Sequence, residues 1–285
     1  MKIELVGVVG AGTMGNGIAH VLAGKGHRVL LCDVDLRLLD RAFETISKNL
    51  DREVAKNKLT SEDKSAALGR IQLTIVRAEL RNCDFVIEAA TEKLEIKSAI
   101  FKELDSICRP EVILASNTSS ISITRLGALT QRPTQVIGMH FFNPVPVMKL
   151  VEVIRGLATA EETFQTVREL ALKLDKTPVE VNDAPGFVSN RVLMPLLNEA
   201  MYAVMEGVAA PKAVDQVFTL GMAHPMGPLA LADFIGLDVC LDILRVLHEG
   251  LGDPKYRPCP LLIKMVDAGW LGKKSGRGFY QYGGA

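Results

Sequence analysis

The stretch Leu5-Val-Gly-Val-Val-Gly-Ala-Gly-Thr-Met-Gly15 starts with a short apolar run and continues into three closely spaced glycines. A β-branched apolar run of this length is typical of a strand that is buried on both faces. The residues that follow, Thr13–Gly24, carry Ile18 and Val21 at helical spacing. The stretch therefore predicts a strand over Leu5–Val9, a tight glycine turn and a helix.

Apolar runs of this kind alternate with helical patterns through about the first 180 residues. The expected strands are Leu5–Val9, Val29–Cys32, Ile71–Ile75, Phe85–Ala89, Val112–Ala115 and Val136–Met139. The expected helices include Thr13–Gly24, Leu36–Lys56, Leu94–Ser106 and Ala160–Leu174. Strand–helix alternation favours a parallel sheet with helices on both faces. Residues 1–183 are thus expected to form an α/β domain, a doubly wound sheet of the Rossmann type.

The pattern changes at the turn-rich cluster Asn182-Asp-Ala-Pro-Gly186. Beyond it, apolar residues between Leu193 and Val204 recur at helical spacing, and no convincing strand follows. We therefore expect an all-helical second domain over residues 184–285.

Composition argues against several classes of protein. Lys+Arg and Asp+Glu are balanced at 33 each in 285 residues, so no excess charge would attract nucleic acid or an acidic membrane. No apolar run is long enough to span a bilayer, and the glycines break up the apolar N-terminus before it could form a signal peptide. The five cysteines are scattered without metal-ligand spacing, which suits a reducing compartment. We expect a cytoplasmic protein that holds no metal.

The segment Gly10-Ala-Gly-Thr-Met-Gly15 fits the pattern G-x-G-x-x-G, which is a weak signal by itself. Its place between a strand and a helix strengthens it. Gly10, Gly12 and Gly15 would allow the tight turn, the approach of a pyrophosphate and close helix–sheet packing. Thr13 and Met14 open the helix, whose first N–H groups would face the phosphates.

Asp33 stands at the end of the second expected strand, where dinucleotide-binding sheets carry an acidic residue. A carboxylate there binds the ribose hydroxyls and repels a 2′-phosphate. Residue 34 is Val, which favours NAD as the cofactor, although Arg28 and Arg37 are near enough in sequence to leave NADP open. The alternative is a glycine turn that only packs the fold, with Asp33 capping the next helix.

His140 and Glu152 lie at either end of an otherwise apolar segment. A carboxylate that accepts one imidazole N–H selects the tautomer and stabilises the charge that appears when the other nitrogen takes a proton. Such a pair is sufficient to remove a proton from an alcohol. The alternative is a buried structural histidine that the glutamate merely caps.

With these residues in view, the chain resembles the L-3-hydroxyacyl-CoA dehydrogenase family, most closely its bacterial 3-hydroxybutyryl-CoA dehydrogenases. The similarity extends nearly end to end, and its most specific blocks are Gly10–Gly15, Val86–Glu92, Ala115–Ser120, His140–Glu152, Asp183–Asn190, Pro225–Pro228 and Gly276–Tyr280. The resemblance implies an NAD-dependent oxidoreductase of fatty acid β-oxidation and butanoate metabolism. It would interconvert a short L-3-hydroxyacyl-CoA, such as 3-hydroxybutyryl-CoA, and the 3-ketoacyl-CoA. It also implies a homodimer.

The resemblance assigns the catalytic acid–base role to His140 and its orientation to Glu152. It gives Ser119 and Asn190 the two polar contacts to the reacting oxygen, where a hydroxyl and an amide can steady alkoxide charge. A helix cap or a turn bond is the alternative for Ser119 and Asn190.

Positions that touch the nicotinamide half of the cofactor in the family fall on Glu92, Lys97, Asn117 and Asn143. Glu92 and Lys97 also bracket an expected helix start, and Asn143-Pro144 is also a turn signal. Lys56 lies in a lysine-rich stretch, Lys48–Lys64, that we expect to be helical and that binds coenzyme A in the family. A solvated helix face is an equal alternative for Lys56.

Two other functions stay open. A 3-hydroxyadipyl-CoA dehydrogenase would need a cation at the far end of the acyl pocket, which Lys149 or Arg191 would supply. A non-catalytic NAD(H)-binding relative would not need the acid–base pair, so the intact set of Ser119, His140, Glu152 and Asn190 argues against it.

Overall fold

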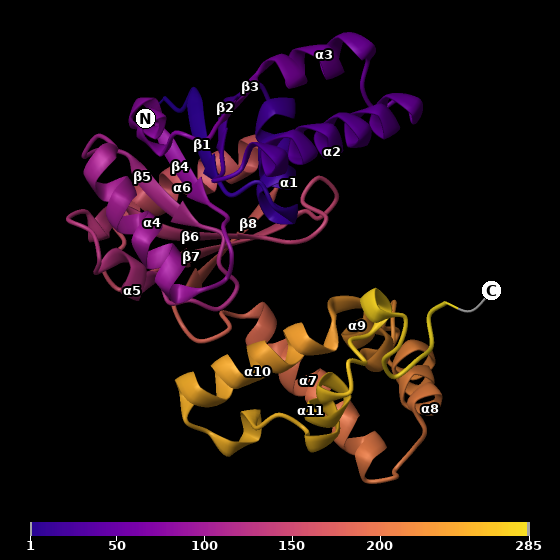
Figure 1. Ribbon diagram of the computed structural model, residues 1–285. Helices are drawn as coiled ribbons and strands as arrows, with labels where there is room; N and C mark the ends of the chain where they lie inside the picture. The colour runs from indigo at the N-terminus through magenta and orange to yellow at the C-terminus, as the bar shows by residue number, and fades with distance from the viewer. Residues whose placement is uncertain (1, 284–285) are drawn as a thin grey trace. The chain divides into compact units, whose positions relative to one another are not determined.

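The computed structural model describes residues 2–283, and the chain divides into two compact units, Met1–Ala184 and Pro185–Ala285. The strands of the first unit are β1 (Leu5–Val9), β2 (Arg28–Cys32), β3 (Ile71–Thr74), β4 (Phe85–Glu88), β5 (Ile113–Ser116), β6 (Val136–Phe141), β7 (Leu150–Arg155) and β8 (Thr177–Asn182). Its α-helices are α1 (Thr13–Gly24), α2 (Leu36–Ala55), α3 (Ser61–Gly69), α4 (Leu94–Ile107), α5 (Ile123–Gly127) and α6 (Glu161–Lys173) (Figure 1).

The strands form one sheet in the order β3-β2-β1-β4-β5-β6-β7-β8. The first six are parallel, as in the doubly wound Rossmann arrangement that the sequence predicts. Each of the six expected strands is present, with ends shifted by at most two residues. Helices α1, α2 and α6 bury apolar side chains in one continuous core on one face, whereas α4 and α5 cover the other (Figure 1). The α/β prediction is confirmed.

Strands β7 and β8 have no counterpart among the expected strands. β7 runs antiparallel to β6 because it returns directly after residues 142–149, without a crossover helix. β8 pairs parallel to β7 at the edge of the sheet, contains Pro178 and is largely exposed. Proline is tolerated at a sheet edge because its missing N–H leaves no partner unpaired there. Neither strand has the continuous apolar pattern of the central strands β1, β2 and β4.

The expectation of one helical stretch over Lys48–Lys64 was wrong. α2 ends at Ala55, Asn57 adopts a left-handed φ of 54°, and α3 begins only at Ser61. Thr60 caps α3, since its hydroxyl accepts a hydrogen bond from the Asp63 N–H and the Asp63 carboxylate accepts one from the Thr60 N–H. This reciprocal capping box starts a new helix.

The second unit is helical, as predicted. It contains α7 (Ser189–Met205), α8 (Pro211–Gln216), α9 (Pro228–Ile235), α10 (Leu237–Leu251) and α11 (Pro260–Asp267), besides shorter turns. Its β-structure within residues 185–283 is limited to isolated bridges. Among residues 2–283, no helix is both long and apolar enough to cross a membrane.

Two buried aspartates organise the end of this unit. Asp233 accepts hydrogen bonds from the Phe279 and Tyr280 N–H groups, and Asp215 accepts one from the Tyr280 hydroxyl at 2.7 Å. A Cβ on Gly278 would lie 2.0 Å from Asp233 Oδ1. The block Gly276–Tyr280 therefore packs against α9 through Asp233, and the contact leaves no room for a side chain at Gly278.

Candidate active site and dinucleotide-binding loop

The three glycines of the β1–α1 loop have different reasons to be glycine. Gly10 has a φ of 103°, and a Cβ on it would lie 2.6 Å from the Ala89 carbonyl oxygen. A Cβ on Gly15 would lie 1.7 Å from the Gly10 oxygen, whereas a Cβ on Gly12 would meet nothing within 4 Å. The fold requires Gly10 and Gly15, and the open side of Gly12 fits the close approach of a pyrophosphate.

The Asp33 carboxylate is tied to this loop. Its Oδ2 accepts a hydrogen bond from the Ala11 N–H and its Oδ1 one from the Val34 N–H, both at 2.6 Å. The cap of α2 is Asp35, which accepts from the Arg37 N–H. The alternative reading of Asp33 as a helix cap was therefore wrong.

Neither of the two arginines that left NADP open adds a free cation beside Asp33. Arg37 forms an ion pair with Asp35, and its hydrogen bonds lower the pKa of the Asp35 carboxyl. Arg28 begins β2 and so lies at the opposite end of that strand from Asp33. Val34 is 73% exposed and adds no charge beside Asp33.

Two cavities flank Gly12. One, of about 370 Å³, also touches Gly10 and Asp33, and the other, of about 400 Å³, also touches Thr13 and Asn143. Met14 follows Thr13 in the first turn of α1 and is partly buried. The first cavity is also lined by residues from stretches that the sequence analysis singled out: Val9, Val34, Ala89, Ala90 and Thr91. No sequence motif indicated its other walls, because they are ordinary helix residues: Leu38, Arg77, Ile96 and Ile100.

The antiparallel pairing of β6 and β7 places His140 directly opposite Glu152. The His140 Nδ1 and Glu152 Oε2 atoms are 2.7 Å apart, and the two residues are 8% and 3% exposed. With Nδ1–H donated to a buried carboxylate, Nε2 is the nitrogen through which His140 exchanges a proton. The arrangement suits general acid–base chemistry.

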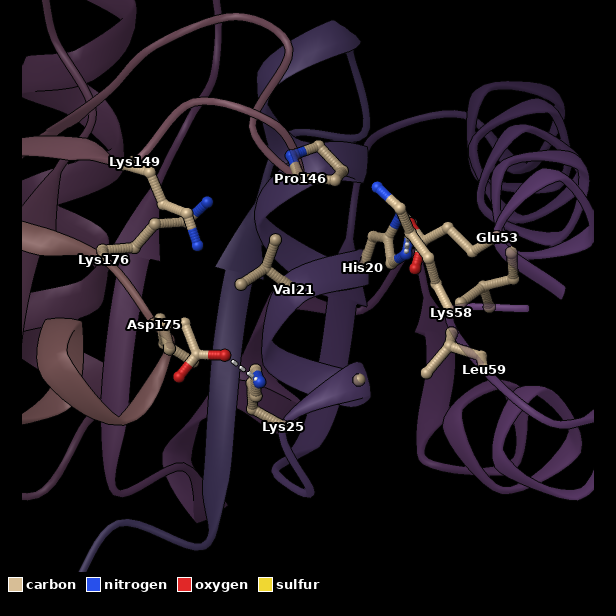
Figure 2. A pocket seen from close by; sticks show the side chains of 13 residues that line it. His20, Val21, Lys25, Glu53, Lys58, Leu59, Pro146, Lys149, Asp175 and Lys176 are labelled. Atoms are coloured by element: carbon tan, nitrogen blue, oxygen red, sulfur yellow. Dashed lines mark hydrogen bonds and ion pairs between the residues drawn. The ribbon is translucent and has the colours of Figure 1, made fainter. Parts of the chain in front are cut away.

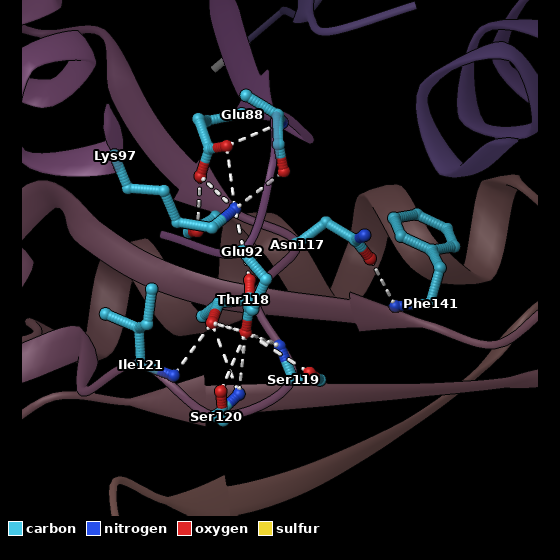
Figure 3. Close-up of polar contacts among 11 residues, drawn as sticks. Glu88, Glu92, Lys97, Asn117, Thr118, Ser119, Ser120, Ile121 and Phe141 are labelled. Atoms are coloured by element: carbon cyan, nitrogen blue, oxygen red, sulfur yellow. Dashed lines mark hydrogen bonds and ion pairs between the residues drawn. The ribbon is translucent and has the colours of Figure 1, made fainter. Parts of the chain in front are cut away.

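Glu92 organises the loop after β5 (Figure 3). Its Oε1 accepts hydrogen bonds from Thr118 Oγ1 at 2.6 Å, from the Ser119 N–H at 2.8 Å and from the Ser120 N–H at 3.0 Å. Burial raises the pKa of Glu92, but Lys97 and these donors outweigh it and hold the pKa below its ordinary value. An ionised Glu92 therefore shapes the loop that carries Ser119.

Lys97 is fully buried in α4. Its ammonium donates to both Glu88 carboxylate oxygens, at 2.8 and 3.0 Å, and lies 3.4 Å from Glu92 Oε2 (Figure 3). Asn117 Oδ1 accepts from the Phe141 N–H at 2.8 Å and so joins the ends of β5 and β6. Both side chains hold together the sheet edge that carries His140.

The remaining predicted residues lie elsewhere in the fold. Asn190 is in the first turn of α7, as expected, within the second unit. Asn143 is exposed and borders the cavity beside Thr13. Lys56 is exposed at the carboxyl end of α2.

A glycine loop after the first strand, a carboxylate after the second and a buried His–Glu pair at the same sheet edge define the class of nicotinamide-dependent dehydrogenases. Residues 5–184 match the 3-hydroxyacyl-CoA dehydrogenase NAD binding domain, and residues 186–282 match the 3-hydroxyacyl-CoA dehydrogenase C-terminal domain. The chain belongs to the 3-hydroxyacyl-CoA dehydrogenase family, and its first unit contains the family's NAD-binding domain.

Relatives of the chain match it over almost its whole length. It is 58% identical over 282 residues to a probable 3-hydroxybutyryl-CoA dehydrogenase of Bacillus subtilis, covering 99% of this chain and 98% of that protein. The crystal structure of (S)-3-hydroxybutyryl-CoA dehydrogenase from Ralstonia eutropha is 50% identical, with a TM-score of 0.97 over 99% of this chain and 100% of that one. The 3-hydroxyadipyl-CoA dehydrogenase of Escherichia coli is 45% identical over 99% of this chain and 60% of its own length.

Proposed function

We propose that this protein interconverts a short-chain L-3-hydroxyacyl-CoA, such as 3-hydroxybutyryl-CoA, and the corresponding 3-ketoacyl-CoA with NAD as cofactor. The observation that carries the proposal is the buried His140–Glu152 hydrogen bond of 2.7 Å at the sheet edge that also bears the glycine loop. A protein that only bound a dinucleotide would gain nothing from this pair.

In the oxidative direction, His140 Nε2 takes the proton of the C3 hydroxyl while Glu152 holds Nδ1–H and stabilises the imidazolium. The nicotinamide, when bound, supplies the acceptor for the C3 hydride. In the reductive direction, His140 returns the proton to the oxygen. Ser119 and Asn190 are proposed to contact that oxygen and to stabilise its developing charge.

The other predicted residues have binding roles in this proposal. The α1 N-terminus with Gly12, Thr13 and Met14 holds the pyrophosphate, and Asp33 receives the ribose hydroxyls. Glu92, Asn117 and Asn143 border the nicotinamide half, and Lys97 positions Glu92. Lys56 is proposed to face a phosphate of coenzyme A.

The direct test is oxidation of NADH with acetoacetyl-CoA, repeated with NADPH. Turnover that prefers NADH supports both the reaction and the role of Asp33. Turnover only with NADPH would contradict the role of Asp33. The His140→Ala variant should bind NADH as the wild-type protein does and lose turnover, because only the proton transfer is removed.

The Escherichia coli relative makes a 3-hydroxyadipyl-CoA dehydrogenase the second candidate. Parallel rates with acetoacetyl-CoA and 3-oxoadipyl-CoA discriminate between the two. A strong preference for the dicarboxylic substrate would replace the first proposal.

A homodimer is also proposed, with the second unit supplying the interface. The exposed apolar side chains of this unit include Val192, Met205, Val208, Val217, Leu220, Met222, Met226 and Phe234. Exposed apolar side chains support an interaction surface on this unit where they lie together. Sedimentation velocity should give twice the chain mass.

The five described cysteines are free and buried, which supports the proposed reducing, cytoplasmic location.

A further inference from the structure

A cavity of about 250 Å³ lies in the first unit between the second half of α1, the turn after α2 and the segments that precede β7 and β8 (Figure 2). Four lysines line it, and only two carboxylates accompany them, so the walls carry a formal charge of +2. The lysines are Lys25, Lys58, Lys149 and Lys176, and the carboxylates are Glu53 and Asp175.

The two carboxylates neutralise the four lysines only in part. Lys25 is paired with Asp175 near the rim. Lys176 is buried, and its ammonium donates to the carbonyl oxygens of Val145 and Met148 rather than to a carboxylate. Figure 2 shows Lys149 and Lys176 reaching into the cavity side by side. Burial, followed by the charge of Lys149, lowers the pKa of Lys176, as expected for like charges held together.

His20 forms part of the wall on the opposite side. It is 4% exposed, and within residues 2–283 its Nδ1 has no hydrogen-bond partner. Its Nε2 lies 3.4 Å from Glu53 Oε1. A buried ring nitrogen without a partner is costly, and either a water or a molecule bound in the adjacent cavity would supply one.

We propose that this cavity is a binding site for a phosphate-bearing small molecule. Phosphate oxygens would be bound by Lys58, Lys149 and Lys176, and the excess positive charge favours an anion. The walls between these groups include the apolar residues Val21, Leu50, Leu59 and Pro146, so the site accepts more than a bare ion. Lys56, assigned above to coenzyme A, is not among the lining residues.

The proposal is independent of turnover and is tested by calorimetry on the full chain. Inorganic pyrophosphate is titrated with NADH saturating, so that the glycine loop is already filled. We expect one site per chain, and about tenfold or more weaker binding in Lys149→Gln and in Lys58→Gln, because each variant removes one of the cations that line the cavity. The matched control is Lys102→Gln, the same substitution at an exposed position of α4 that should leave binding unchanged.

Competition identifies the source of the phosphate. Displacement of pyrophosphate by CoA but not by dephospho-CoA assigns the site to the 3′-phosphate of the substrate, and displacement by both assigns it to the CoA pyrophosphate. Failure of both to displace it assigns a free phosphorylated metabolite. All three results support the site. No pyrophosphate binding, or equal weakening in Lys102→Gln, would overturn it, whatever the rate with acetoacetyl-CoA.

Discussion

At the scale of single residues, Glu152 is the clearest target, because its carboxylate is 3% exposed and bonded to His140. Glu152→Gln keeps an acceptor for Nδ1–H and removes the charge that stabilises the imidazolium. We expect kcat to fall about a hundredfold or more while the Kd of NADH stays unchanged. The control is Glu180→Gln in β8, where the carboxylate is half-exposed and pairs with Arg155. A kcat within about twofold of wild type would reject this role for Glu152.

A second prediction at the residue scale concerns Asp33 and the preference for NADH over NADPH. Asp33→Ser removes the charge that repels a 2′-phosphate, so the preference for NADH over NADPH should fall by about tenfold or more. The comparison is Asp35→Asn, which removes a neighbouring charge that caps α2 and pairs with Arg37. Equal loss of preference in both variants would mean that general charge, rather than the position of Asp33, selects the cofactor. Steady-state kinetics with both cofactors measures the ratio.

At the scale of elements, the β1–α1 loop separates folding from binding. Gly15→Ala places a Cβ 1.7 Å from the Gly10 oxygen, so we expect at least about 3 kcal/mol of destabilisation. Gly12→Ala meets no protein atom within 4 Å, and it should melt as the wild type does but lose most of its affinity for NADH. Thermal denaturation and NADH titration of both variants test this contrast. Full NADH affinity in Gly12→Ala would show that the open side of Gly12 does not face the cofactor.

The start of α3 gives a second prediction about an element. Thr60 and Asp63 form its capping box, so Thr60→Ala should lower the free energy of unfolding by about 1 kcal/mol. Ser65→Ala, in the interior of the same helix, should have little effect, because alanine is the stronger helix former. Urea denaturation followed by circular dichroism measures both values. Equal stability of the two variants would contradict the cap.

At the scale of the whole molecule, His20 makes stability depend on pH. Burial, followed by the charge of Lys176, lowers the pKa of His20 from 6.5 to about 4. The unfolded chain therefore binds a proton at this position below pH 6.5 that the folded chain takes up only near pH 4. The contribution of His20 to the free energy of unfolding is complete above pH 6.5, falls as the pH drops towards 4 and changes little below that. The total loss is about 3 kcal/mol.

The variant His20→Phe should lose less stability on acidification than the wild-type protein, because it lacks the group that takes up this proton. Unfolding has to be followed by circular dichroism, because Trp270 and all four tyrosines belong to the second unit and their fluorescence reports on that unit alone. The measurement is made in a phosphate-free buffer, so that no phosphate binds in the cavity beside His20. If His20→Phe lost as much stability between pH 6.5 and pH 4 as the wild-type protein, the pH dependence would belong to other groups.

Local features of the sequence were enough to predict the six parallel strands, the glycine loop and the helical second unit. Each depends on a short run of residues, such as Leu5–Val9 or Gly10–Gly15, whose backbone and burial preferences act within a few positions. The sequence did not predict β7 and the edge strand β8, because neither has a continuous apolar pattern. The sequence analysis missed the break before Thr60 because the charged residues of Lys48–Lys64 continue across it, whereas the capping box depends on Thr60 and Asp63 alone.

The residue types and their order along the chain were enough to single out His140, Glu152, Glu92 and Asp33 as candidate site residues. Only the tertiary structure decided what each one touches. An antiparallel return of the chain brings Glu152 to His140, β5 delivers the Ser119 loop to Glu92, and the β1–α1 turn brings the Ala11 N–H to Asp33. These partners are separated by 12, 27 and 22 positions, so their hydrogen bonds exist only once strand pairing has closed the intervening chain.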